Sequence, residues 1–356
     1  MSQYEYPVSF TEDVINKIEG ALTLDEPLLY QHHSGESGFF RPGRLSISDA
    51  PELEIVLYHN DATSKFMYLR KCNLDSNLLD IIGLNANEFS SRAEQILPGQ
   101  LCLGSDRAQV IGDAITILTG SPSLAGIFSS LKQQNIAIFP IAREGLKYLV
   151  AEAIFSNYGF FCDEIVLDAH HVFDSSVPVY NRTVELTLFK DKDLDQHQKE
   201  NINVAFLADS IASGLVMKEV IARVSERFEN LQRIEVIAPL STVRGLCRIA
   251  QSEANKKLHV RVHVFETLLN ALPPDYYYSA HFADPNFHIQ PDLEREYRAW
   301  WGKDSDGNNI ADTACAGYGW SEVFYSPRKQ IQMMNSQLIS RHKITIADIV
   351  RRNLKP

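Results

Sequence analysis

Short apolar runs alternate with segments in which apolar residues recur every three or four positions over most of the chain after residue 105. Runs of four to eight apolar residues are typical of buried strands, and the longer spacing is typical of amphipathic helices. The strand-like runs are 136–141, 164–168, 184–189, 204–207, 234–238 and 259–265. The helical segments are 108–118, 123–131, 146–154, 216–224 and 243–254. This alternation predicts an α/β fold with a doubly wound, mostly parallel sheet, in which ligands bind at the carboxyl ends of the strands.

The N-terminal part of the chain follows a more mixed pattern. Residues 11–19 combine a threonine, an acidic first turn and apolar spacing, which together predict a short helix. Two apolar runs, 54–59 and 65–70, are separated by a polar segment at 60–64, which predicts a β-hairpin. We therefore expect an additional N-terminal α+β region over residues 1–105.

A polar, glycine-rich segment at 32–43 includes His32, His33 and Arg41, and Arg44 is close by. The segment is either a lid that reaches a ligand or a plain surface loop. The surface loop is favoured, because such residues are common turn formers.

The main domain is expected at 106–325, followed by a helical, basic tail at 326–356. The stretch before the tail is irregular and rich in aromatic residues. In it, Trp300 and Trp301 are interpreted as packing residues rather than as a platform for an aromatic ligand. Residues 304–309 resemble a calcium loop but lack its closing glutamate, so a turn is favoured.

Three of the strand-like runs end in loops of small, polar or glycine residues that lead into a helix. The loops are 139–146, 208–215 and 238–245. Backbone N–H groups in such a loop, with the positive end of the helix dipole, are a common device for holding a phosphate. An ordinary strand-to-helix turn explains the second loop equally well when it is taken alone. Helix capping is favoured for Ser241 and Thr242 in the third.

The first loop carries a more specific signal. Arg143 would give bidentate recognition of a phosphate at the start of a helix. Gly145 would allow close backbone approach before the helix. Three such loops in one alternating domain are more informative than any one of them.

The order and spacing of these loops resemble the type I phosphoribosyltransferases, most closely the uracil phosphoribosyltransferase branch. Residues 140–146 read Pro-Ile-Ala-Arg-Glu-Gly-Leu, close to that family's Pro-Ile-Leu-Arg-Ala-Gly-Leu. Residues 208–214 read Ala-Asp-Ser-Ile-Ala-Ser-Gly and fit the family's acidic-acidic-apolar-apolar-small-Thr-Gly pattern, with Ser213 in the threonine position. The third loop, at 237–241, is only loosely similar. The resemblance covers residues 108–320.

The resemblance implies binding of 5-phosphoribosyl diphosphate with Mg²⁺. Arg143 and Gly145 would hold the diphosphate, Asp209 would meet the ribose hydroxyls, and the loop 212–215 would wrap the 5-phosphate. The implied catalytic residues are Asp209 and Arg143. The implied substrate-binding residues are Arg143, Glu144, Gly145, Arg182, Lys190, Asp209, Ser210, Ala212, Ser213, Gly214, Leu215 and Asp312.

Two parts of the implied site come from elsewhere in the chain. Arg182 and Lys190 fall where the family carries a mobile basic hood, and they are candidates for contact with the diphosphate. Asp312 lies in a glycine-containing segment at 307–320, where the family has a Mg²⁺-linked aspartate. Asp312 is therefore the implied metal ligand.

The implied reaction is transfer of the 5-phosphoribosyl group to a nucleobase-like or related small-molecule acceptor, with release of diphosphate. Cleavage of the bond between C1 and the diphosphate builds oxocarbenium character. Such a site must neutralise the leaving group and exclude water more than it needs a strong nucleophile. The absence of any Ser/His/Asp set or metal-ligand cluster in the sequence agrees with that requirement.

The sequence also departs from the family pattern. Ala208 occupies a position that is acidic in many relatives, and Leu215 and Val216 replace small or hydroxyl residues. These departures favour an alternative, a non-catalytic regulatory protein that binds a nucleotide or sugar phosphate on the same fold.

Composition narrows the remaining choices. The chain has 356 residues, of which 45% are apolar and 22% charged, as in an ordinary globular protein. Its net charge of -11 argues against sequence-independent binding to nucleic acid, but not against a small phosphorylated ligand in a local pocket. The 5 cysteines are scattered, and neither a signal peptide nor a long apolar run is present. We expect a cytoplasmic homodimer without membrane contact.

Overall fold

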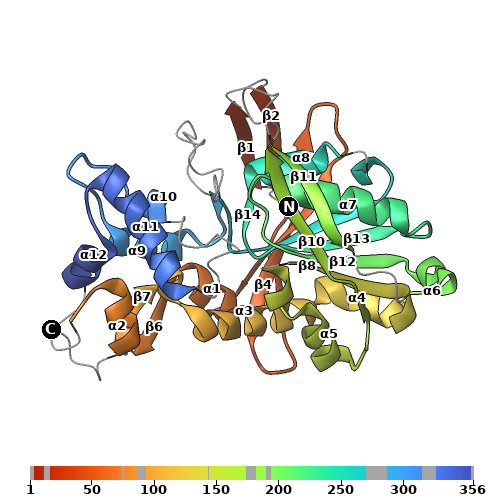
Figure 1. Cartoon of the computed structure of the whole chain (residues 1–356), viewed down its shortest axis with the longest axis horizontal. Helices are drawn as coiled ribbons and strands as arrows, with labels where there is room; N and C mark the ends of the chain where they lie inside the picture. Colours follow the sequence, from red (N-terminus) through yellow and green to blue (C-terminus); the bar gives the residue numbers. More distant parts are fainter. Residues whose placement is uncertain are drawn as a thin grey trace.

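The computed structural model describes residues 4–11, 17–73, 76–85, 94–142, 144–173, 182–189, 194–252, 254–269, 287–314 and 326–353. The strands of its largest sheet are β1 (Tyr4–Thr11), β2 (Lys17–Leu24), β3 (Leu28–Gln31), β4 (Ser37–Ile47), β5 (Leu53–Asn60), β8 (Ile136–Ala142), β9 (Asp163–Glu164), β10 (Leu167–Phe173), β11 (Arg182–Phe189), β12 (Val204–Ala208), β13 (Arg233–Ile237) and β15 (His259–Phe265). The strand order is β1-β2-β4-β5-β15-β13-β12-β8-β10-β11, with β3 beside β4 and β9 beside β8 (Figure 1).

Helices and two small sheets complete the described part of the chain. The helices are α1 (Asp61–Met67), α2 (Ser76–Ile82), α3 (Gly104–Thr119), α4 (Pro122–Ser130), α5 (Val150–Tyr158), α6 (Gln196–Asn201), α7 (Leu215–Arg227), α8 (Val243–Ala250), α9 (Pro291–Trp301), α10 (Ala311–Ala314), α11 (Pro327–His342) and α12 (Ile346–Asn353). The small sheets pair β6 (Leu69–Asn73) with β7 (Glu94–Pro98), and β14 (Ser241–Thr242) with β16 (Thr267–Leu269) and β17 (Phe287–His288).

The central strands are parallel and are covered on both faces. Parallel pairing runs without a break through β5, β15, β13, β12, β8 and β10. Alternate residues of β8 enter different cores: Ile136 and Ile138 pack with α3, α4 and α5, whereas Ala137 and Phe139 pack with α7 and α8. Figure 1 shows these two sets of helices on opposite sides of the strands. The predicted α/β fold with a doubly wound, mostly parallel sheet is confirmed.

The hairpin predicted between residues 54 and 70 is wrong in its second half. The first strand is β5, but residues 61–67 form α1 instead of a turn and a strand. The cause is a capping box, in which the Asn60 side chain accepts from the Thr63 N–H (2.9 Å) and the Thr63 hydroxyl accepts from the Asn60 N–H (2.8 Å). The polar residues that suggested a turn are therefore the start of a helix.

The short helix predicted at 11–19 is also wrong where the structure describes it. Thr11 ends β1 and Lys17 begins β2, and the two strands pair antiparallel in the register Thr11↔Lys17. The segment 32–43 is only partly a loop, because residues 37–43 belong to β4. Pairing between strands has overridden the local helical spacing at 17–19.

Two predicted elements in the main domain have different bounds. The helix predicted at 146–154 begins at Val150, because Leu149 has a left-handed backbone with φ 50°. The strand predicted at 164–168 is divided between β9 and β10. β10 then turns back into β11 as an antiparallel hairpin.

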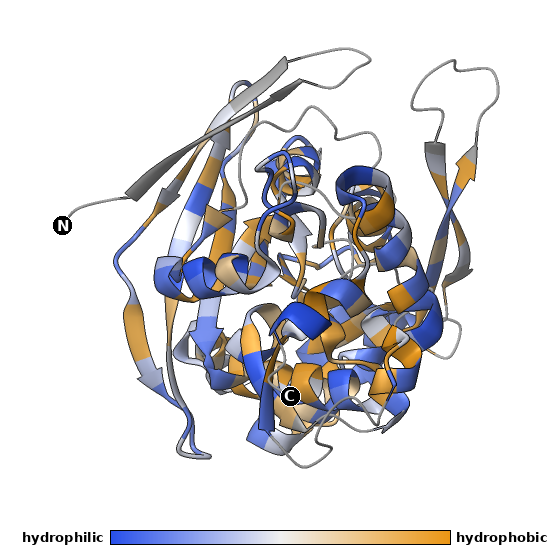
Figure 2. Ribbon diagram, turned by 90° about the vertical axis from the view of Figure 1, so that its left-hand side faces the viewer, coloured by the Kyte–Doolittle hydropathy of each residue, from blue (hydrophilic) through white to orange (hydrophobic). Residues whose placement is uncertain are grey.

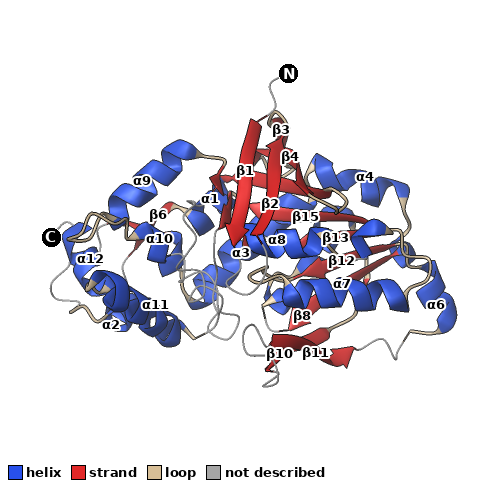
Figure 3. Ribbon diagram, turned by 90° about the horizontal axis from the view of Figure 1, so that it is seen from above, coloured by secondary structure: helices blue, strands red, loops and turns tan. Residues whose placement is uncertain are grey.

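The C-terminal helices pack into the same core as the central sheet. Figure 3 shows α9, α10, α11 and α12 grouped to one side of the sheet, near α2 and β6. Trp300 and Trp301 are both buried in the core shared with α3 and α5, which confirms their packing role. The stretch that looked irregular before the tail contains α9 and α10, and within the predicted tail the structure has α11 and α12.

Among the described residues, no single helix has the length and apolarity needed to cross a membrane. α3 and α4 meet that requirement only as a pair, and they are bent by 63° with respect to each other.

Strand β5 has an interior place in the sheet although it comes from the predicted N-terminal region. It pairs with β15 on one side and with β4 on the other. The predicted division at residues 105 and 325 stays a prediction.

Candidate functional site

The loop after β12 runs from Asp209 to Gly214 and leads into α7. Its first part stays paired to the segment after β13: the Ile211 N–H donates to the Leu240 carbonyl (2.8 Å). The Thr242 N–H in turn donates to the Ile211 carbonyl (2.9 Å). The loop therefore lies at the carboxyl end of the parallel strands, where α/β folds place their ligands.

Two glycines let this loop pack against the start of α8. Gly214 has φ 77°, and a Cβ there would lie 2.5 Å from the Gly245 carbonyl oxygen. A Cβ on Gly245 would lie 2.4 Å from Ile211 Cγ2. A side chain at either position would push α7 and α8 apart, so the close approach requires glycine at both.

Side chains from α8 and its cap bind the carbonyl groups of the loop. The Thr242 hydroxyl donates to the Ala212 carbonyl (2.5 Å) and accepts from the Gly245 N–H (2.9 Å). Arg248 Nη1 donates to the Ser213 carbonyl (2.6 Å). The prediction that Thr242 caps a helix is confirmed, and the cap also holds the loop after β12.

The amide groups of the same loop have no such partners. Within the described part of the chain, no group accepts a hydrogen bond from the backbone N–H of Ala212, Ser213 or Gly214. Ser213 and Gly214 are buried, and the 13-residue helix α7 begins directly after them. Buried amides without a protein acceptor, at the positive end of a helix, suit an anion such as a phosphate.

The first predicted loop meets this one through its backbone. Arg143 lies outside the described residues, and Glu144 and Gly145 follow it. A Cβ on Gly145 would lie 1.8 Å from the Ala208 carbonyl oxygen, so only glycine fits there. The loops after β8 and β12 are therefore in direct contact.

Glu144 lies in a buried cluster of three oxygen groups. Its Oε1 is 3.0 Å from the Tyr148 hydroxyl and 3.1 Å from the Ser210 hydroxyl, and the two hydroxyls are 2.7 Å apart. The two hydroxyls supply two protons for these three contacts, and burial, which raises the pKa of Glu144, favours a third on its carboxyl. The Ser210 N–H also donates to the Asp209 carboxylate (2.9 Å), which extends the network into the second loop.

The two carboxyl groups disfavour each other's ionisation. Burial raises the pKa of Asp209 well above its usual range, and the neighbouring charge of Glu144 raises it further. Burial also raises the pKa of Glu144, although the positive charge of Arg107 lowers it in part. Arg107 comes from α3, is 1% exposed and lies over the Phe66 ring. The pair resists carrying two negative charges at once.

The donor set fits a magnesium ion only together with a ligand. Carboxylate and hydroxyl oxygens, such as those of Asp209, Glu144 and Ser210, are of the kind that Mg²⁺ takes. The described residues contain no group of three or more His, Cys, Asp or Glu side chains that could hold a metal ion. Mg²⁺ is commonly bound by one or two carboxylates plus phosphate oxygens. This edge of the sheet therefore suits an ion that arrives with a diphosphate.

Asp312 is not brought to these loops. It lies on α10, where its carboxylate is 2.9 Å from Arg298 Nη1. Figures 1 and 3 both show α10 among the C-terminal helices, away from β12 and α7. Its predicted role as a metal ligand stays a prediction.

The predicted hood corresponds to the hairpin of β10 and β11. β10 pairs with β8 only at Leu167 and Asp168, so residues 169–173 continue past the end of β8. At about 3.3 Å per residue this projection is about 17 Å long. Arg182 begins β11 opposite Phe173, at the far end of the hairpin, and Lys190 lies outside the described residues.

A second polar pair, which the sequence did not indicate, lies at the carboxyl ends of β15 and β5. Glu266 is fully buried and has φ 58°, which is rare for a residue other than glycine. Its two oxygens are each 3.0 Å from His59 Nδ1, and Oε1 is 2.5 Å from the Thr63 hydroxyl. Burial raises the pKa of Glu266. Glu266 thus fixes the orientation of the His59 ring.

Tyr148 and Arg107 were also missed by the sequence reasoning. Tyr148 stands four residues after Glu144, a spacing that brings side chains together on one turn of a helix. The sequence did not indicate Tyr148, because the helix predicted over 146–154 rests on its apolar positions alone. No pattern in the sequence indicated Arg107, because its approach to Glu144 depends on how α3 packs against the sheet.

No family model matches this chain, and no curated protein matches it. Among solved structures, the chain is similar to an adenine phosphoribosyl transferase from Trypanosoma brucei, with 10% identity and a TM-score of 0.34 over 59% of this chain and 83% of that one. It is similar to a hypoxanthine phosphoribosyltransferase from Staphylococcus aureus, with 12% identity and a TM-score of 0.30 over 52% and 90% of the two chains.

A third similar structure is an orotate phosphoribosyltransferase from Francisella tularensis, with 13% identity, a TM-score of 0.28 and coverage of 58% of this chain and 84% of that chain. All three are type I phosphoribosyltransferases, and none is a uracil phosphoribosyltransferase. At such identities and TM-scores the likeness assigns no activity to this chain.

Proposed function

We propose that the chain binds 5-phosphoribosyl diphosphate with Mg²⁺ and transfers its 5-phosphoribosyl group to a nucleobase-like or related acceptor, releasing diphosphate. The observation that carries this proposal is the set of amides of Ala212, Ser213 and Gly214 at the start of α7, the last two of them in buried residues, which have no acceptor among the described residues. A 5-phosphate would satisfy them. The loop sequences support the same class of ligand through their resemblance to phosphoribosyltransferases, most closely the uracil branch.

Each loop has a defined part in this proposal. The loop 212–215 holds the 5-phosphate through the amides of Ala212, Ser213 and Gly214, and the Asp209 carboxylate accepts hydrogen bonds from the ribose hydroxyls. Arg143 and the backbone of Gly145 bind the diphosphate. Arg182 approaches from the β10–β11 hairpin. We also propose that the protein is a cytoplasmic homodimer.

The chemistry needs charge neutralisation rather than a nucleophilic side chain. The C1–O bond to diphosphate breaks and the diphosphate leaves with the electron pair, while a bond forms between C1 and the acceptor, which loses a proton to solvent or to a nearby base. Mg²⁺ bound with the diphosphate would supply positive charge to the leaving group. Arg143 adds to that charge, and the carboxylate of Asp209 favours the developing positive charge on the ribose.

The alternative is a regulatory protein that binds the same class of ligand without turning it over. It is favoured by Ala208, where many relatives carry an acid, and by the carboxyl of Glu144 buried beside Asp209. A protonated Glu144 contributes no charge to the ribose or to a metal. Binding without turnover would be the outcome that selects this alternative.

The test is binding followed by turnover. Isothermal titration with 5-phosphoribosyl diphosphate and MgCl₂ should show a single site in the wild type. A ligand at about 100 times its Kd stabilises a protein by about 2.7 kcal/mol, so the thermal midpoint should rise by several degrees. Asp209→Asn should weaken the binding at least about tenfold, the loss of one charge-assisted hydrogen bond.

Asp292→Asn is the matched control, because Asp292 is exposed on α9 and far from the loops. It should bind as the wild type does. Diphosphate release with a panel of nucleobases then separates the enzyme from the non-catalytic binder. Folded protein that shows no binding at millimolar ligand would rule out both.

A further inference from the structure

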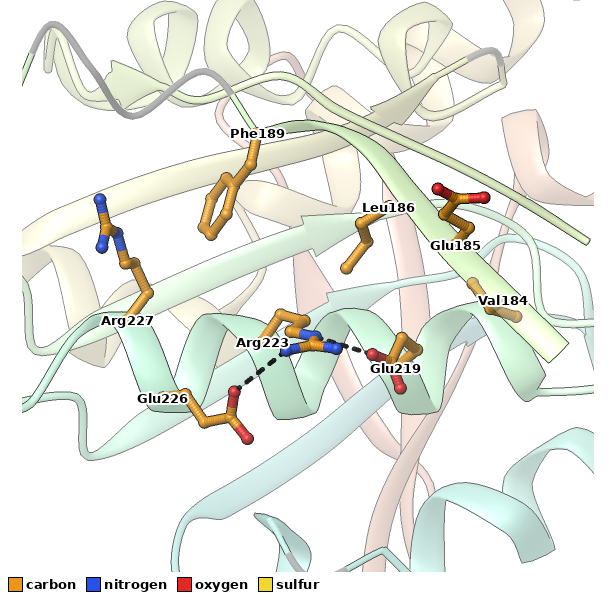
Figure 4. Close-up of a pocket in the computed structure, with 8 residues that line it drawn as sticks. All are labelled: Val184, Glu185, Leu186, Phe189, Glu219, Arg223, Glu226 and Arg227. Carbon is orange, nitrogen blue, oxygen red and sulfur yellow. Dashed lines mark hydrogen bonds and ion pairs between the residues drawn. The ribbon is translucent and has the colours of Figure 1, made fainter.

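A groove of about 590 Å³ lies between β11 and α7 (Figure 4). Its lining residues are Val184, Glu185, Leu186 and Phe189 of β11 and Glu219, Arg223, Glu226 and Arg227 of α7. The groove shares no lining residue with the loop from Asp209 to Gly214. Its volume is in the range of sites that hold small molecules or short peptide segments.

The strand side of the groove is apolar apart from Glu185. Val184 and Leu186 are two residues apart on β11, so both project to the same side of the strand. Phe189 continues this wall and packs beside Phe139 and Phe228, at centroid distances of 6.3 Å and 6.4 Å. Figure 4 shows the three β11 side chains directed toward α7. This wall therefore offers apolar contact to a ligand bound in the groove.

The helix side of the groove is charged. Glu219, Arg223 and Glu226 follow one another at helical spacing and share one face of α7. Arg223 Nε is 2.8 Å from Glu219, and its Nη1 is 3.6 Å from Glu226. One arginine is thus shared by two carboxylates, and the 67% exposed Glu226 side chain faces solvent at the rim.

A smaller groove of about 200 Å³ continues the first one. It shares Glu226 and Arg227 and adds Gln196, Lys199, Glu200 and Glu229. Together the two grooves are lined by more carboxylates than cationic side chains. The whole chain carries a net charge of -11, so this surface favours a basic occupant and disfavours a second copy of the same chain.

The groove runs beside an open edge of the sheet. β11 is the last strand in the order, and among the described strands it pairs only with β10. Figures 2 and 3 both place this hairpin at the outer margin of the molecule. An unpaired edge offers a row of N–H and C=O groups, and an extended chain is the partner that satisfies them.

We propose that this groove docks an extended segment of another protein in which basic and apolar residues alternate, added as a strand to the free edge of β11. Alternate side chains of an added strand face α7, and in this segment they are the basic ones. Their aliphatic stems contact the wall of Val184, Leu186 and Phe189, and their charged groups meet Glu219 and Glu226. The face of α7 from residue 219 to residue 227 is about 12 Å long, which spans about four extended residues. This docking site is independent of the proposed ligand loops.

Synthetic peptides about seven residues long test the proposal with the full chain in fluorescence anisotropy. A labelled peptide that alternates lysine with valine or leucine should bind saturably. The same peptide with glutamate in place of lysine should bind at least about tenfold more weakly. A lysine peptide N-methylated on the backbone nitrogens that face β11 should lose binding, because it cannot extend the sheet.

A charge reversal on the protein gives the matching test. The double variant Glu219→Lys and Glu226→Lys should weaken the lysine peptide about tenfold and strengthen the glutamate peptide. Glu296→Lys, an exposed change on α9, is the control and should leave both affinities unchanged. Sedimentation of the protein without peptide tests whether the groove mediates self-association. Leu186→Lys should leave the sedimentation of the protein unchanged.

Four results would overturn the proposal. These are the absence of saturable binding at millimolar peptide, equal binding of the N-methylated peptide, and an effect of Glu296→Lys as large as that of the double variant. Self-association that Leu186→Lys abolishes would show that a second copy of the chain is the occupant, and the proposal would fail in that case also.

Discussion

The Glu144 carboxyl, the Tyr148 hydroxyl and the Ser210 hydroxyl make three contacts with one another, and the two hydroxyls carry only two protons. Glu144 is 3% exposed. Burial raises its pKa, and it in turn raises the pKa of Asp209. Folding therefore favours the protonated form of Glu144, whereas in the unfolded chain the carboxyl ionises above a pKa of about 4.3.

The sign of the pH dependence follows from this difference. A carboxyl whose pKa is higher in the folded state costs no stability below the unfolded pKa, and the cost grows as the pH rises above it. Glu144→Gln keeps the acceptor oxygen but has no proton to lose. The free energy of unfolding of the variant, relative to the wild type, should therefore rise between pH 4 and pH 8. Urea unfolding at a series of pH values measures it.

Glu296→Gln, the same change at an exposed position on α9, is the control for this prediction. It should not reproduce the pH dependence of Glu144→Gln. Glu144→Gln also removes the charge interaction between Glu144 and Arg107, which shifts the whole curve. The test is therefore how the difference in free energy of unfolding changes with pH, and not its size at any one pH. A difference that stays constant with pH would contradict a raised pKa for Glu144.

At the residue scale, the sequence predicted the glycines of the site better than its polar contacts. Gly145 and Gly214 are at strand-to-helix turns, and a glycine in such a turn signals close approach or positive φ. Both have such a reason here, a contact with the Ala208 carbonyl and a φ of 77°. Tyr148 and Arg107 were not predicted, because only the packing of α3 and the turn before α5 brings them to Glu144.

At the scale of elements, α8 supports the anion-binding loop through a single hydroxyl. Thr242 Oγ1 caps α8 by accepting from Gly245, and it donates to the Ala212 carbonyl. Thr242→Val has nearly the same shape and loses both bonds. It should lower the free energy of unfolding by about 1–3 kcal/mol, because a half-buried carbonyl and a helix N–H are left unpaired.

Thr242→Ser keeps the hydroxyl and should remain within about 1 kcal/mol of the wild type. Urea unfolding gives both values. Binding of 5-phosphoribosyl diphosphate should fall in the valine variant and not in the serine variant, since only the former releases the loop. Equal stability of the two variants would contradict the role assigned to the hydroxyl.

Elements were predicted well where burial alone determines them. The runs that became β8, β12, β13 and β15 are buried on both faces, so their apolar pattern has one reading. The prediction for residues 61–67 was wrong because the same polar residues suit a turn and a helix cap. The prediction for residues 11–19 was wrong because pairing with a neighbouring strand is not visible in the local spacing of apolar residues.

At the scale of the whole molecule, the N-terminal region is part of the central sheet. The Tyr58 hydroxyl of β5 is 2.8 Å from His263 Nδ1 of β15, and His263 Nε2 is 2.5 Å from Glu235 of β13. Burial alone would raise the pKa of Glu235. The hydrogen bond from His263 and the charges of Arg261 and Arg233 instead lower it to about 2. This buried polar network joins β5 to the strands that carry the site.

The last prediction concerns the boundary at residue 105. A chain limited to residues 106–356 lacks β5, so β15 becomes an open edge and His263 loses the Tyr58 hydroxyl. We expect it to aggregate or to lose its near-ultraviolet circular dichroism, because an exposed apolar edge strand promotes association. Removing only residues 1–16 takes away the outermost strand β1 and should preserve cooperative unfolding in urea. If the chain of residues 106–356 unfolds cooperatively as a soluble species, the N-terminal region is an accessory addition. If only the shorter deletion does so, the parallel sheet requires β5, and the main domain begins before residue 53.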